Sequence, residues 1–359
     1  MKVKLGELTK IKTGKLDANA SSPDGEYPFF TCSREPLRIS NYSYDCECVL
    51  VAGNGDLNVK YYNGKFDAYQ RTYIIEDNGS KRLYMPYLYF FMDGYIEELR
   101  KQSIGGVIKY IKLGNLTDAM IELPDVETQK SVVTVLNKAK GIIDRRQKEI
   151  QSLDELIKAR FVEVFEDGQS PIKNVEELCS AIVDCPHTTP KYEGELKNPA
   201  IRTSEIKKGF ISWESMRYVS DEEYEERVSR LRPEAGDIVY GREGTFGNAA
   251  ILPEGFKFCL GQRVMLLRPD YSKCTSEYLL HAVISDDVYR QAVGKNNAST
   301  VAHVNVKDVK HFKVPLPSFE KQNEFALFVQ QVDKSKVAIQ KSLDETQLLF
   351  DSLMQQYFG

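Results

Sequence analysis

The chain has 359 residues, a formal net charge of −4 and 42% hydrophobic residues, so it has room for two or three domains and is not a uniformly basic binder of polyanions. No apolar run approaches the roughly 18 residues of a membrane span, and the N-terminal segment lacks the apolar core of a signal peptide. The seven cysteines include no C-x-x-C pair, which favours reduced thiols and a cytoplasmic location.

The first part of the chain, residues 1–124, carries the pattern of β-strands. Runs rich in Val, Ile, Tyr and Phe occur as YPFFTC, CVLVA, VKYYNGKF and QRTYII. The segment MPYLYFFMDGYIEELRK, which comes after these runs, predicts a short helix. We therefore expect a β-rich domain with one helix.

The run CVLVAGNGD raises the question of a nucleotide-binding loop, because it ends in Gly53-x-Gly55. Such a loop needs a third glycine and a helix directly after it, so that backbone amides converge on the phosphate. Position 58 is Asn, and the next segment contains Asn63-Gly64, which is typical of a hairpin turn. We predict that Gly53-x-Gly55 is a turn between strands and that a hairpin is centred on Asn63-Gly64.

A long helix is predicted over residues 125–166. Asp125 suits the N-cap, and Glu127 lies in the first turn, where a carboxylate interacts favourably with the helix dipole. Apolar residues then recur in steps of four and three, which is the heptad pattern of a coiled coil.

The next part, residues 167–317, again carries the pattern of a β-rich domain. Its strand candidates are PAIRTSEI, GFISW, DIVYG, KFCLGQRVMLL and HFKVPL, and SEYLLHAVISDDVYRQAV predicts a short helix. A second long helix follows over residues 318–359, with Ser318 at the N-cap.

The chain is an internal duplication. A shift of 193 residues places LPDVETQ (123–129) on LPSFEKQ (316–322) and brings the two heptad seams into the same register. Each helix is about 40 residues, or roughly 60 Å, long. We predict that the helices pair as a coiled coil, although two unrelated amphipathic helices on separate cores remain an alternative. The seam residues assigned to the coiled coil are Leu136, Ile143, Ile150, Leu153, Ile157, Val329, Ile339, Leu343, Phe350 and Leu353.

The duplication extends into the β-rich domains. We match Gly53 with Gly241, and Gln70-Arg71 with Gln262-Arg263, across a four-residue insertion. GREGTFG in the second half stands where the first half has AGNGD.

No catalytic motif is present. The four histidines form no H-E-x-x-H, there is no G-x-S-x-G, and no Pro-Pro dipeptide occurs, as an amino-methyltransferase would need. Two alternatives stay open, a metal site at Cys46-x-Cys48 and a Cys–His dyad in DCPH, residues 184–187. We expect a chain with no catalytic residues, no cofactor site and no metal site.

The order of the motifs resembles the specificity subunit of a type I restriction-modification system. The residues that carry the resemblance are LPDVETQ and LPSFEKQ, GDIVYGREGTFGNAAI with GQRVMLLRP, the starts VKLGEL and VEELCS, and DCPHTTPKY with AIRTSEIKKGFISW. The resemblance covers essentially the whole chain. The first half departs from it, because it has no counterpart of PHTTPKY.

The resemblance implies an α+β fold in which two β-rich target-recognition domains, related by a pseudo-two-fold repeat, are separated by two long antiparallel coiled-coil helices. Each domain would read one half of a split, asymmetric target in double-stranded DNA. Methyltransferase subunits would dock on the helices and motor-nuclease subunits would join them. Adenine methylation and ATP-dependent cleavage would belong to these partners, which bind S-adenosylmethionine, ATP and magnesium.

Candidate DNA contacts are polar side chains in or beside predicted loops, since arginine pairs with guanine, asparagine with adenine, and cations with phosphates. In the first domain they are Arg34, Asn54, Asn58, Lys60, Tyr61, Arg71 and Lys109. In the second they are His187, Thr188, Lys191, Arg202, Arg242, Arg263, Lys295, Asn296, Asn297 and His303. A protein-binding coiled-coil scaffold and a self-sufficient DNA methyltransferase are the competing interpretations.

Overall fold

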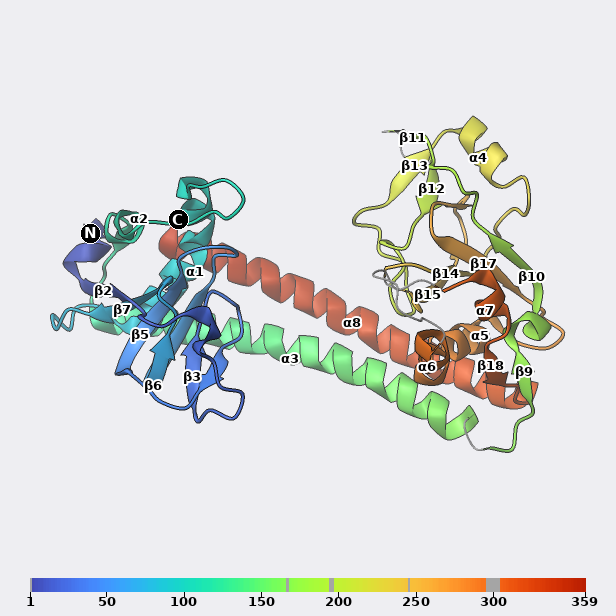
Figure 1. Cartoon of the computed structure of the whole chain (residues 1–359), viewed down its shortest axis with the longest axis horizontal. Helices are drawn as coiled ribbons and strands as arrows, with labels where there is room; N and C mark the ends of the chain where they lie inside the picture. The colour runs from blue at the N-terminus through green and yellow to red at the C-terminus, as the bar shows by residue number, and fades with distance from the viewer. Residues whose placement is uncertain (1, 166–167, 194–196, 245, 295–303) are drawn as a thin grey trace. The chain divides into compact units, whose positions relative to one another are not determined.

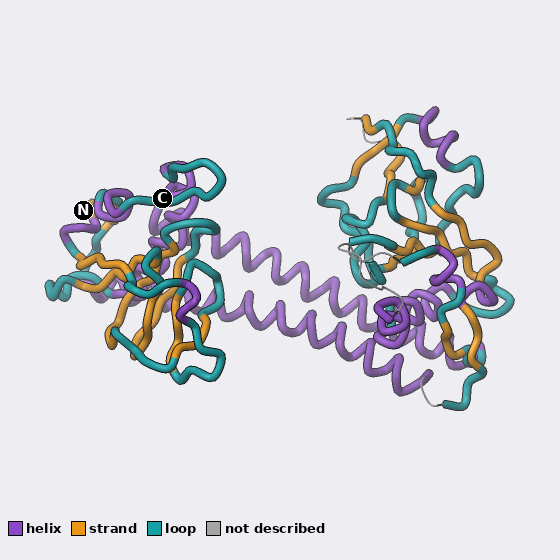
Figure 2. The backbone as a smooth tube through the Cα atoms, viewed as in Figure 1, coloured by secondary structure: helices purple, strands orange, loops and turns teal. Residues whose placement is uncertain are grey.

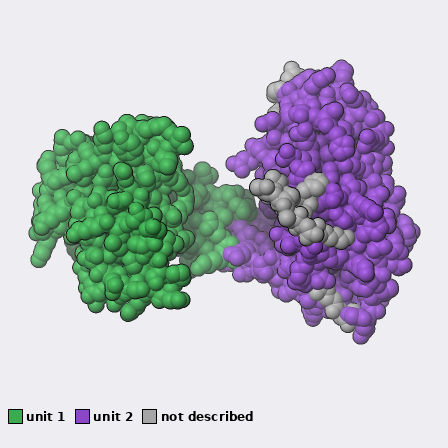
Figure 3. Space-filling model, in the orientation of Figure 1, with its two compact units in different colours: residues 1–148, 340–359 green, residues 149–339 purple. Residues whose placement is uncertain are grey.

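The computed structural model describes residues 2–165, 168–193, 197–244, 246–294 and 304–359. It divides into two compact units, which are coloured separately in Figure 3. Unit 1 comprises residues 1–148 and 340–359, and unit 2 comprises residues 149–339. Two 40-residue helices, α3 (Val126–Phe165) and α8 (Phe319–Phe358), contribute one stretch to each unit.

The described part of unit 1 that precedes α3 is built from strands and two α-helices (Figures 1 and 2). In chain order its elements are β1 (Lys2–Lys4), β2 (Thr9–Thr13), β3 (Tyr27–Phe30), β4 (Leu37–Ile39), β5 (Tyr44–Ala52), β6 (Val59–Ala68), β7 (Thr72–Asp77), α1 (Met85–Gln102), α2 (Leu113–Thr117) and β8 (Met120–Glu122).

The six-stranded sheet of unit 1 has the order β2-β7-β5-β6-β3-β4. All neighbouring strands are antiparallel except β3 and β6, which run parallel. Gly53-x-Gly55 lies in the link between β5 and β6, so the predicted turn at this position is confirmed.

The predicted hairpin at Asn63-Gly64 is wrong. Both residues lie inside β6, where they pair with Glu47 and Cys46 of β5 in unbroken register. Gly64 takes a φ of +135°, a conformation that glycine allows at little steric cost. The Asn-Gly signal reports only a local preference, and the long ladder with β5 overrides it.

The core of unit 1 lies between the sheet, α1 and the two long helices. Tyr87, Leu88 and Phe91 of α1 are buried in this core, and the ring of Tyr87 contacts that of Phe358 of α8 in a tilted arrangement, with ring centroids 4.9 Å apart. Leu136 of α3 is fully buried in the same cluster. The final turns of α8 therefore complete the core of the unit that holds the first strands.

Unit 2 has a second set of elements with a longer β-rich segment. In chain order they are β9 (Ile172–Asn174), β10 (Cys179–Asp184), β11 (Tyr192–Glu193), β12 (Asn198–Ile201), β13 (Arg217–Val219), α4 (Asp221–Arg227), β14 (Ile238–Gly241), β15 (Ala249–Ile251), β16 (Cys259–Leu260), β17 (Val264–Pro269), α5 (Ser276–Val283), α6 (Asp286–Gly294), α7 (Val306–Lys310) and β18 (Lys313–Pro315).

The β part of unit 2 contains two four-stranded sheets, in the orders β10-β17-β14-β15 and β11-β13-β12-β16, and a two-stranded antiparallel sheet of β9 and β18. The parallel pair of β12 and β16 repeats that of β3 and β6. In unit 1 the single strand β6 pairs with both β5 and β3, whereas in unit 2 these roles are divided between β15 and β16.

Two predictions for this segment are wrong. GFISW forms no strand; only Ile211 makes an isolated bridge, to Ile206. The single helix expected over residues 276–293 is broken into α5 and α6 at Ser285, whose hydroxyl accepts a hydrogen bond from the amide of Val288 and so begins a new helix.

The core of unit 2 is closed by aromatic side chains of the long helices. Phe161 and Phe165 of α3 contact Phe325 of α8, with ring centroids 5.6 and 5.1 Å apart, and Phe165 also contacts Tyr278 of α5. All four rings are almost completely buried.

Helices α3 and α8 run antiparallel, and in each unit a stretch of one lies beside a stretch of the other (Figure 2). Asp125 and Ser318 accept hydrogen bonds from the amides of Thr128 and Lys321, so the predicted N-caps are confirmed. Among the assigned seam residues, Leu136, Ile143, Ile157 and Val329 are buried. The half-buried seam residues are Ile150, Leu153, Ile339, Leu343, Phe350 and Leu353.

The start of α3 is locked by a buried glutamine. Gln129 has no exposed surface, and its Oε1 accepts a hydrogen bond from the amide of Tyr84 at 2.8 Å. Its Nε2 donates to the carbonyls of Arg82 and Pro124. One side chain thereby ties the helix to the segment that leads into α1.

Gln322 repeats this clamp at the start of α8. It is also fully buried, accepts from the amide of Thr275 at 2.9 Å, and donates to the carbonyls of Lys273 and Pro317. The two units therefore share their strand framework, their helix starts and a buried polar contact. The predicted α+β fold with a pseudo-two-fold repeat and two antiparallel helices is confirmed. None of the helices in the described part of the chain has the length and apolar character needed to cross a membrane.

Candidate nucleic-acid interface

Four loops of unit 1 are joined by hydrogen bonds around residues 53–58. The amide of Gly53 donates to the carbonyl of Arg71 at 2.8 Å, and the amide of Gly55 donates to the carbonyl of Lys109 at 3.0 Å. The side-chain amide of Asn58 donates to the carbonyl of Cys32 at 2.8 Å. We call residues 31–36, 53–58, 69–71 and 103–110 the unit 1 loop cluster.

The unit 1 loop cluster presents several cations to solvent. Arg34, Arg71 and Lys109 are exposed, while Lys60 is half-buried, and burial lowers the pKa of its ammonium group. Within the described part of the chain, the side chains of Arg71 and Lys109 have no hydrogen-bond or ion-pair partner. Asn54 lies between these loops, in an isolated bridge with Tyr110.

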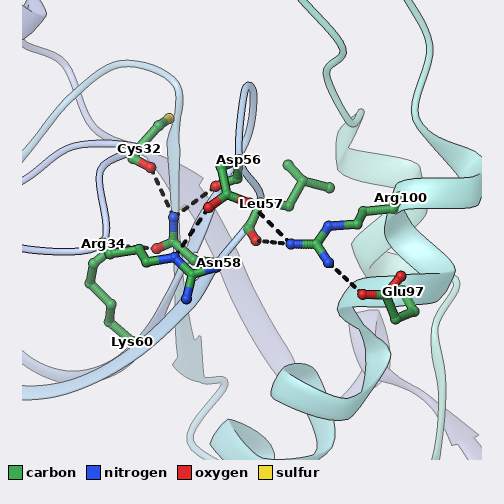
Figure 4. A network of polar contacts seen from close by, with 8 residues as sticks. All are labelled: Cys32, Arg34, Asp56, Leu57, Asn58, Lys60, Glu97 and Arg100. Atoms are coloured by element: carbon green, nitrogen blue, oxygen red, sulfur yellow. Dashed lines mark hydrogen bonds and ion pairs between the residues drawn. The ribbon is translucent and has the colours of Figure 1, made fainter. Parts of the chain in front are cut away.

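Figure 4 shows the polar contacts at the centre of this cluster. The carboxylate of Asp56 binds two arginines, with one oxygen 3.1 Å from Nε of Arg34 and the other 3.0 Å from Nη2 of Arg100. Arg100 also donates to the carbonyl of Leu57 at 3.3 Å. These contacts hold the loop on the end of α1.

Asn58 has a structural role in the same network. Its side-chain amide donates to the carbonyls of Cys32 and Asp56, each at 2.8 Å, and its Oδ1 accepts from Lys60. These contacts occupy both the donor and the acceptor of the side chain, so Asn58 shapes the loop. Tyr61 lies outside the cluster on β6, where its hydroxyl donates to Glu47 at 2.8 Å.

The corresponding loops of unit 2 contain two arginine–carboxylate pairs. Arg242 is buried, and its Nη2 lies 2.8 Å from Asp184. Arg263 is exposed, has a φ of 64° and pairs with Glu243 at 2.9 Å. The ring of His187 is exposed and lies 3.7 Å from the second oxygen of Asp184.

A buried arginine of α4 holds the loop that carries His187. Arg227 donates to the carbonyls of Leu260 and Gly261 at 2.9 and 3.0 Å, and to the carbonyl of Thr188 at 3.4 Å. Thr188 itself is exposed. The neighbouring Lys191 is also exposed, and no partner for its ammonium group occurs among the described residues.

Arg202 serves the interior of unit 2. Its guanidinium binds the fully buried carboxylate of Glu205, with Nε to Oε2 at 3.1 Å, and donates to the carbonyl of Ser215. Buried carboxylates need such partners, so this contact has a structural purpose. The predicted contacts Lys295, Asn296, Asn297 and His303 lie outside the described residues.

Backbone hydrogen bonds correct the sequence match between the loops. Gly53 donates to the carbonyl of Arg71 and accepts from the amide of Ile111, and Arg242 makes the same two contacts, with Arg263 and Val304. Gly53 therefore corresponds to Arg242, one residue beyond the predicted Gly241. The Gly-x-Gly motif is too short for the sequence to indicate where the insertion between the two halves begins.

The two units thus present different side chains from one backbone arrangement. Arg242 and Glu243 in unit 2 stand where unit 1 has Gly53 and Asn54, whereas Arg263 corresponds to Arg71. A shared frame with different side chains is what a pair of related sites with different ligands requires.

Among the described residues, no three His, Cys, Asp or Glu side chains form a group that could hold a metal ion. Cys46 is half-buried and Cys48 is fully buried, and burial raises the pKa of the Cys46 thiol to about 11. In DCPH, Cys185 lies in the core, whereas His187 is exposed beside Asp184.

Several residues of these sites were missed from the sequence. Arg100, Asp56 and Arg227 lie on or beside helices and loops whose packing only the fold reveals, and no local motif marks them. Gln129 and Gln322 did carry a signal, since they occupy the same place in both repeats.

The fold and these loops define a duplicated α+β protein in which each unit bears polar loops on a β-rich part and contains a stretch of each of two antiparallel helices. A sequence model of the family described as "Type I restriction modification DNA specificity domain" matches residues 1–155 and 193–346. The chain therefore belongs to the family of type I restriction-modification specificity subunits.

Individual relatives agree with this assignment. The chain is 26% identical to the type I restriction enzyme EcoDI specificity subunit of Escherichia coli, over 98% of this chain and 85% of that protein. It is 22% identical to the EcoBI specificity subunit of the same organism, over 78% and 64% of the respective chains.

Solved structures share the fold. A crystal structure of the S subunit of a type I restriction-modification system from M. genitalium matches with a TM-score of 0.62 and 16% identity, over 100% of this chain and 96% of that chain. A structure concerned with complex assembly and conformational transition of the type I system matches with a TM-score of 0.56 and 15% identity, over 100% and 97%.

Proposed function

We propose that the chain is the non-catalytic DNA-reading subunit of a type I restriction-modification complex and that it reads an asymmetric, bipartite target. Each β-rich unit would read one half-site through its loop cluster. The observation that carries the proposal is the repeated backbone frame with different side chains, because a common frame docks alike on two half-sites while different side chains select different bases.

The proposed division of the chain follows the repeat. Residues 1–124 and 167–317 would be the target-recognition domains, and residues 125–166 and 318–359 the spacer helices. Half-sites one turn of duplex apart are separated by roughly 34 Å, so two readers need a stiff element that fixes their spacing. Two paired helices of 40 residues supply that stiffness.

The proposed partners supply the chemistry. Methyltransferase subunits would dock on the spacer helices, and motor-nuclease subunits would complete the complex. S-adenosylmethionine, ATP and magnesium would bind to those subunits, and this chain would need no cofactor. Its seven cysteines, all described, are free thiols, which supports a cytoplasmic location.

Among the predicted contacts, the exposed cations without a protein partner are the strongest candidates for DNA binding. They are Arg71 and Lys109 in unit 1 and Lys191 in unit 2. Arg34, His187, Thr188 and Arg263 are also exposed and stay candidates, as does Asn54. Asn58 and Arg202 are proposed instead to shape the loops.

Genome-wide mapping of methylated adenines tests the proposal. Cells that contain the gene should show a split, asymmetric motif that disappears when the gene is deleted and returns on complementation. Methylation that is identical in both strains would contradict the assignment.

Two alternatives make different predictions. A self-sufficient methyltransferase would transfer tritiated methyl groups to DNA as the purified chain alone, and the absence of a Pro-Pro-aromatic pocket disfavours it. A protein-binding scaffold would assemble with its partners but show no sequence preference in electrophoretic shift experiments with genomic fragments.

A further inference from the structure

The unit 1 loop cluster contains an anion site that is occupied by the chain's own carboxylate. Two guanidinium groups, from Arg34 in a loop and Arg100 on α1, bind opposite oxygens of Asp56 at 3.1 and 3.0 Å (Figure 4). A phosphodiester offers two anionic oxygens to such a pair of arginines, as a carboxylate does.

All three groups are open to solvent. The exposed fractions of the side chains are 74% for Arg34, 57% for Asp56 and 40% for Arg100. Ion pairs this exposed are weak, so an incoming phosphate can replace the carboxylate at little cost. Arg71 and Lys109, both exposed, belong to the same hydrogen-bonded set of loops.

We propose that Arg34 and Arg100 form a binding site for a DNA backbone phosphate, and that Asp56 occupies this site in the DNA-free chain. The inference rests on the proposed function, since it assumes that unit 1 meets DNA through this loop cluster. Asp56 acts as a competitor that limits binding to any duplex, which suits a reader that must not be held by random sequence.

The charged groups beside the two arginines determine which of them is freed when a phosphate replaces Asp56. Arg100 also pairs with Glu97, its neighbour one turn earlier on α1, and keeps this partner when Asp56 leaves. Arg34 has no second ion-pair partner in the described part of the chain. Loss of the Asp56 charge therefore frees chiefly Arg34.

The test uses a gain of binding, which a misfolded variant cannot imitate. Asp56→Asn keeps the size of the side chain and the backbone carbonyl that accepts from Asn58. The full-length chain, assembled with its partner subunits, is titrated against a random-sequence 30-base-pair duplex over a range of salt. At about 50 mM salt the variant should bind roughly three- to tenfold more tightly, with a salt slope steeper by about 0.9.

A matched control and a second substitution make the test decisive. Asp118→Asn removes the same charge from another exposed ion pair, with Lys4 at 2.9 Å, outside the loop cluster. It should leave binding within twofold of the wild type. Arg34→Gln in the Asp56→Asn background should abolish the gain.

The outcomes separate this inference from the proposed function. An equal gain in Asp118→Asn, a gain that survives Arg34→Gln, or no gain in Asp56→Asn would overturn the phosphate site. A wild-type complex that binds all sequences equally would overturn the proposed function instead, because the phosphate site is measured on random DNA.

Discussion

Arginines of two kinds lie at the candidate interface. Arg71 is exposed and forms no ion pair within the described residues, whereas Arg202 and Arg242 pair with Glu205 and Asp184 inside unit 2. The sequence presents all of them as equivalent cations near loops. Only the fold reveals which charges the protein itself neutralises, and this separates candidate DNA contacts from structural residues.

Arg71→Ala should weaken DNA binding without disturbing the fold. The substitution removes one exposed cation, so the salt slope should become flatter by about 0.9 and affinity should fall alike on target and random duplexes. Fluorescence anisotropy over a range of salt measures both quantities. Arg38→Ala, an exposed arginine of β4 that donates to the carbonyl of Glu26, is the control and should leave the slope unchanged.

The buried side chains of Gln129 and Gln322 are expected to stabilise the fold. Gln129→Met keeps the volume of the side chain but leaves the amide of Tyr84 and two carbonyls without their partner. Unpaired buried groups of this kind cost about 1–3 kcal/mol each, so the free energy of unfolding should fall by at least about 1 kcal/mol. Thermal and denaturant unfolding measure the change.

The repeat supplies comparisons for this experiment. Gln322→Met should produce a similar loss, with faster hydrogen exchange confined to unit 2. Gln340→Met, an exposed helix residue, should change stability by less than about 0.5 kcal/mol. Equal losses in all three variants would mean that the clamps have no special role.

At the scale of elements, the long helices were predictable and the short strands less so. The N-caps at Asp125 and Ser318, the heptad seam and the absence of proline specify each helix locally over 40 residues. A short strand instead depends on a partner distant in sequence. GFISW lacks such a ladder, and Asn63-Gly64 sits within one that no local signal reveals.

His281 on α5 predicts a pH dependence for the packing of the long helices in unit 2. Its ring lies 5.1 Å from that of Phe325 and 6.4 Å from that of Phe161. Burial, with a smaller contribution from Lys336, lowers the pKa of His281 from 6.5 to about 4. Between pH 6.5 and pH 4 the imidazole is protonated in the unfolded chain but stays largely neutral in the folded chain. The free energy of unfolding should therefore fall as the pH decreases from 6.5 to 4.

Variants isolate this contribution to the pH profile. His281→Leu removes the proton-binding group, so the decrease in unfolding free energy between pH 6.5 and pH 4, about 3 kcal/mol at most for this residue, should be reduced. His311→Leu, at an exposed site 3.6 Å from Glu176, is the comparison. A profile for His281→Leu that coincides with that of the wild type would exclude the effect.

The end of α8 predicts a second effect on stability. Phe358 is half-buried against Tyr87 and Phe91, so Phe358→Ala should lower the free energy of unfolding of unit 1 by about 2 kcal/mol, less than a fully buried phenylalanine would. Leu348→Ala, on the same helix but 70% exposed, should have little effect. Hydrogen exchange read separately in α1 and α5 locates the loss.

At the scale of the whole molecule, the duplication was the feature best read from sequence. A single shift of 193 residues aligns the starts of the two long helices, the strands directly before them and the pair of buried glutamines. The unit boundaries were not evident in this way, since α3 and α8 each contribute to both units. Chain order alone cannot reveal that the first and last segments share one core.

A heptad inserted into both long helices tests the proposed spacer. Seven residues add about 10 Å and preserve the seam, so the gap between half-sites should grow by about three base pairs. Three base pairs also rotate the second half-site by about 100°, and methylation of the new motif should be incomplete. Adenine methylation mapping measures the gap, and an unchanged motif would contradict the spacer role.

The contact between α1 and the last turns of α8 has a consequence for how the protein is made. The ribosome completes β1 to α1 first, but the aromatic face of α1 at Tyr87 and Phe91 gains its partner Phe358 only after more than 250 further residues have been added. The first unit therefore emerges from the ribosome with an exposed apolar surface. Chaperones that bind nascent chains should therefore affect the folding of unit 1 more than that of unit 2. Slow codons late in the gene should have the same effect.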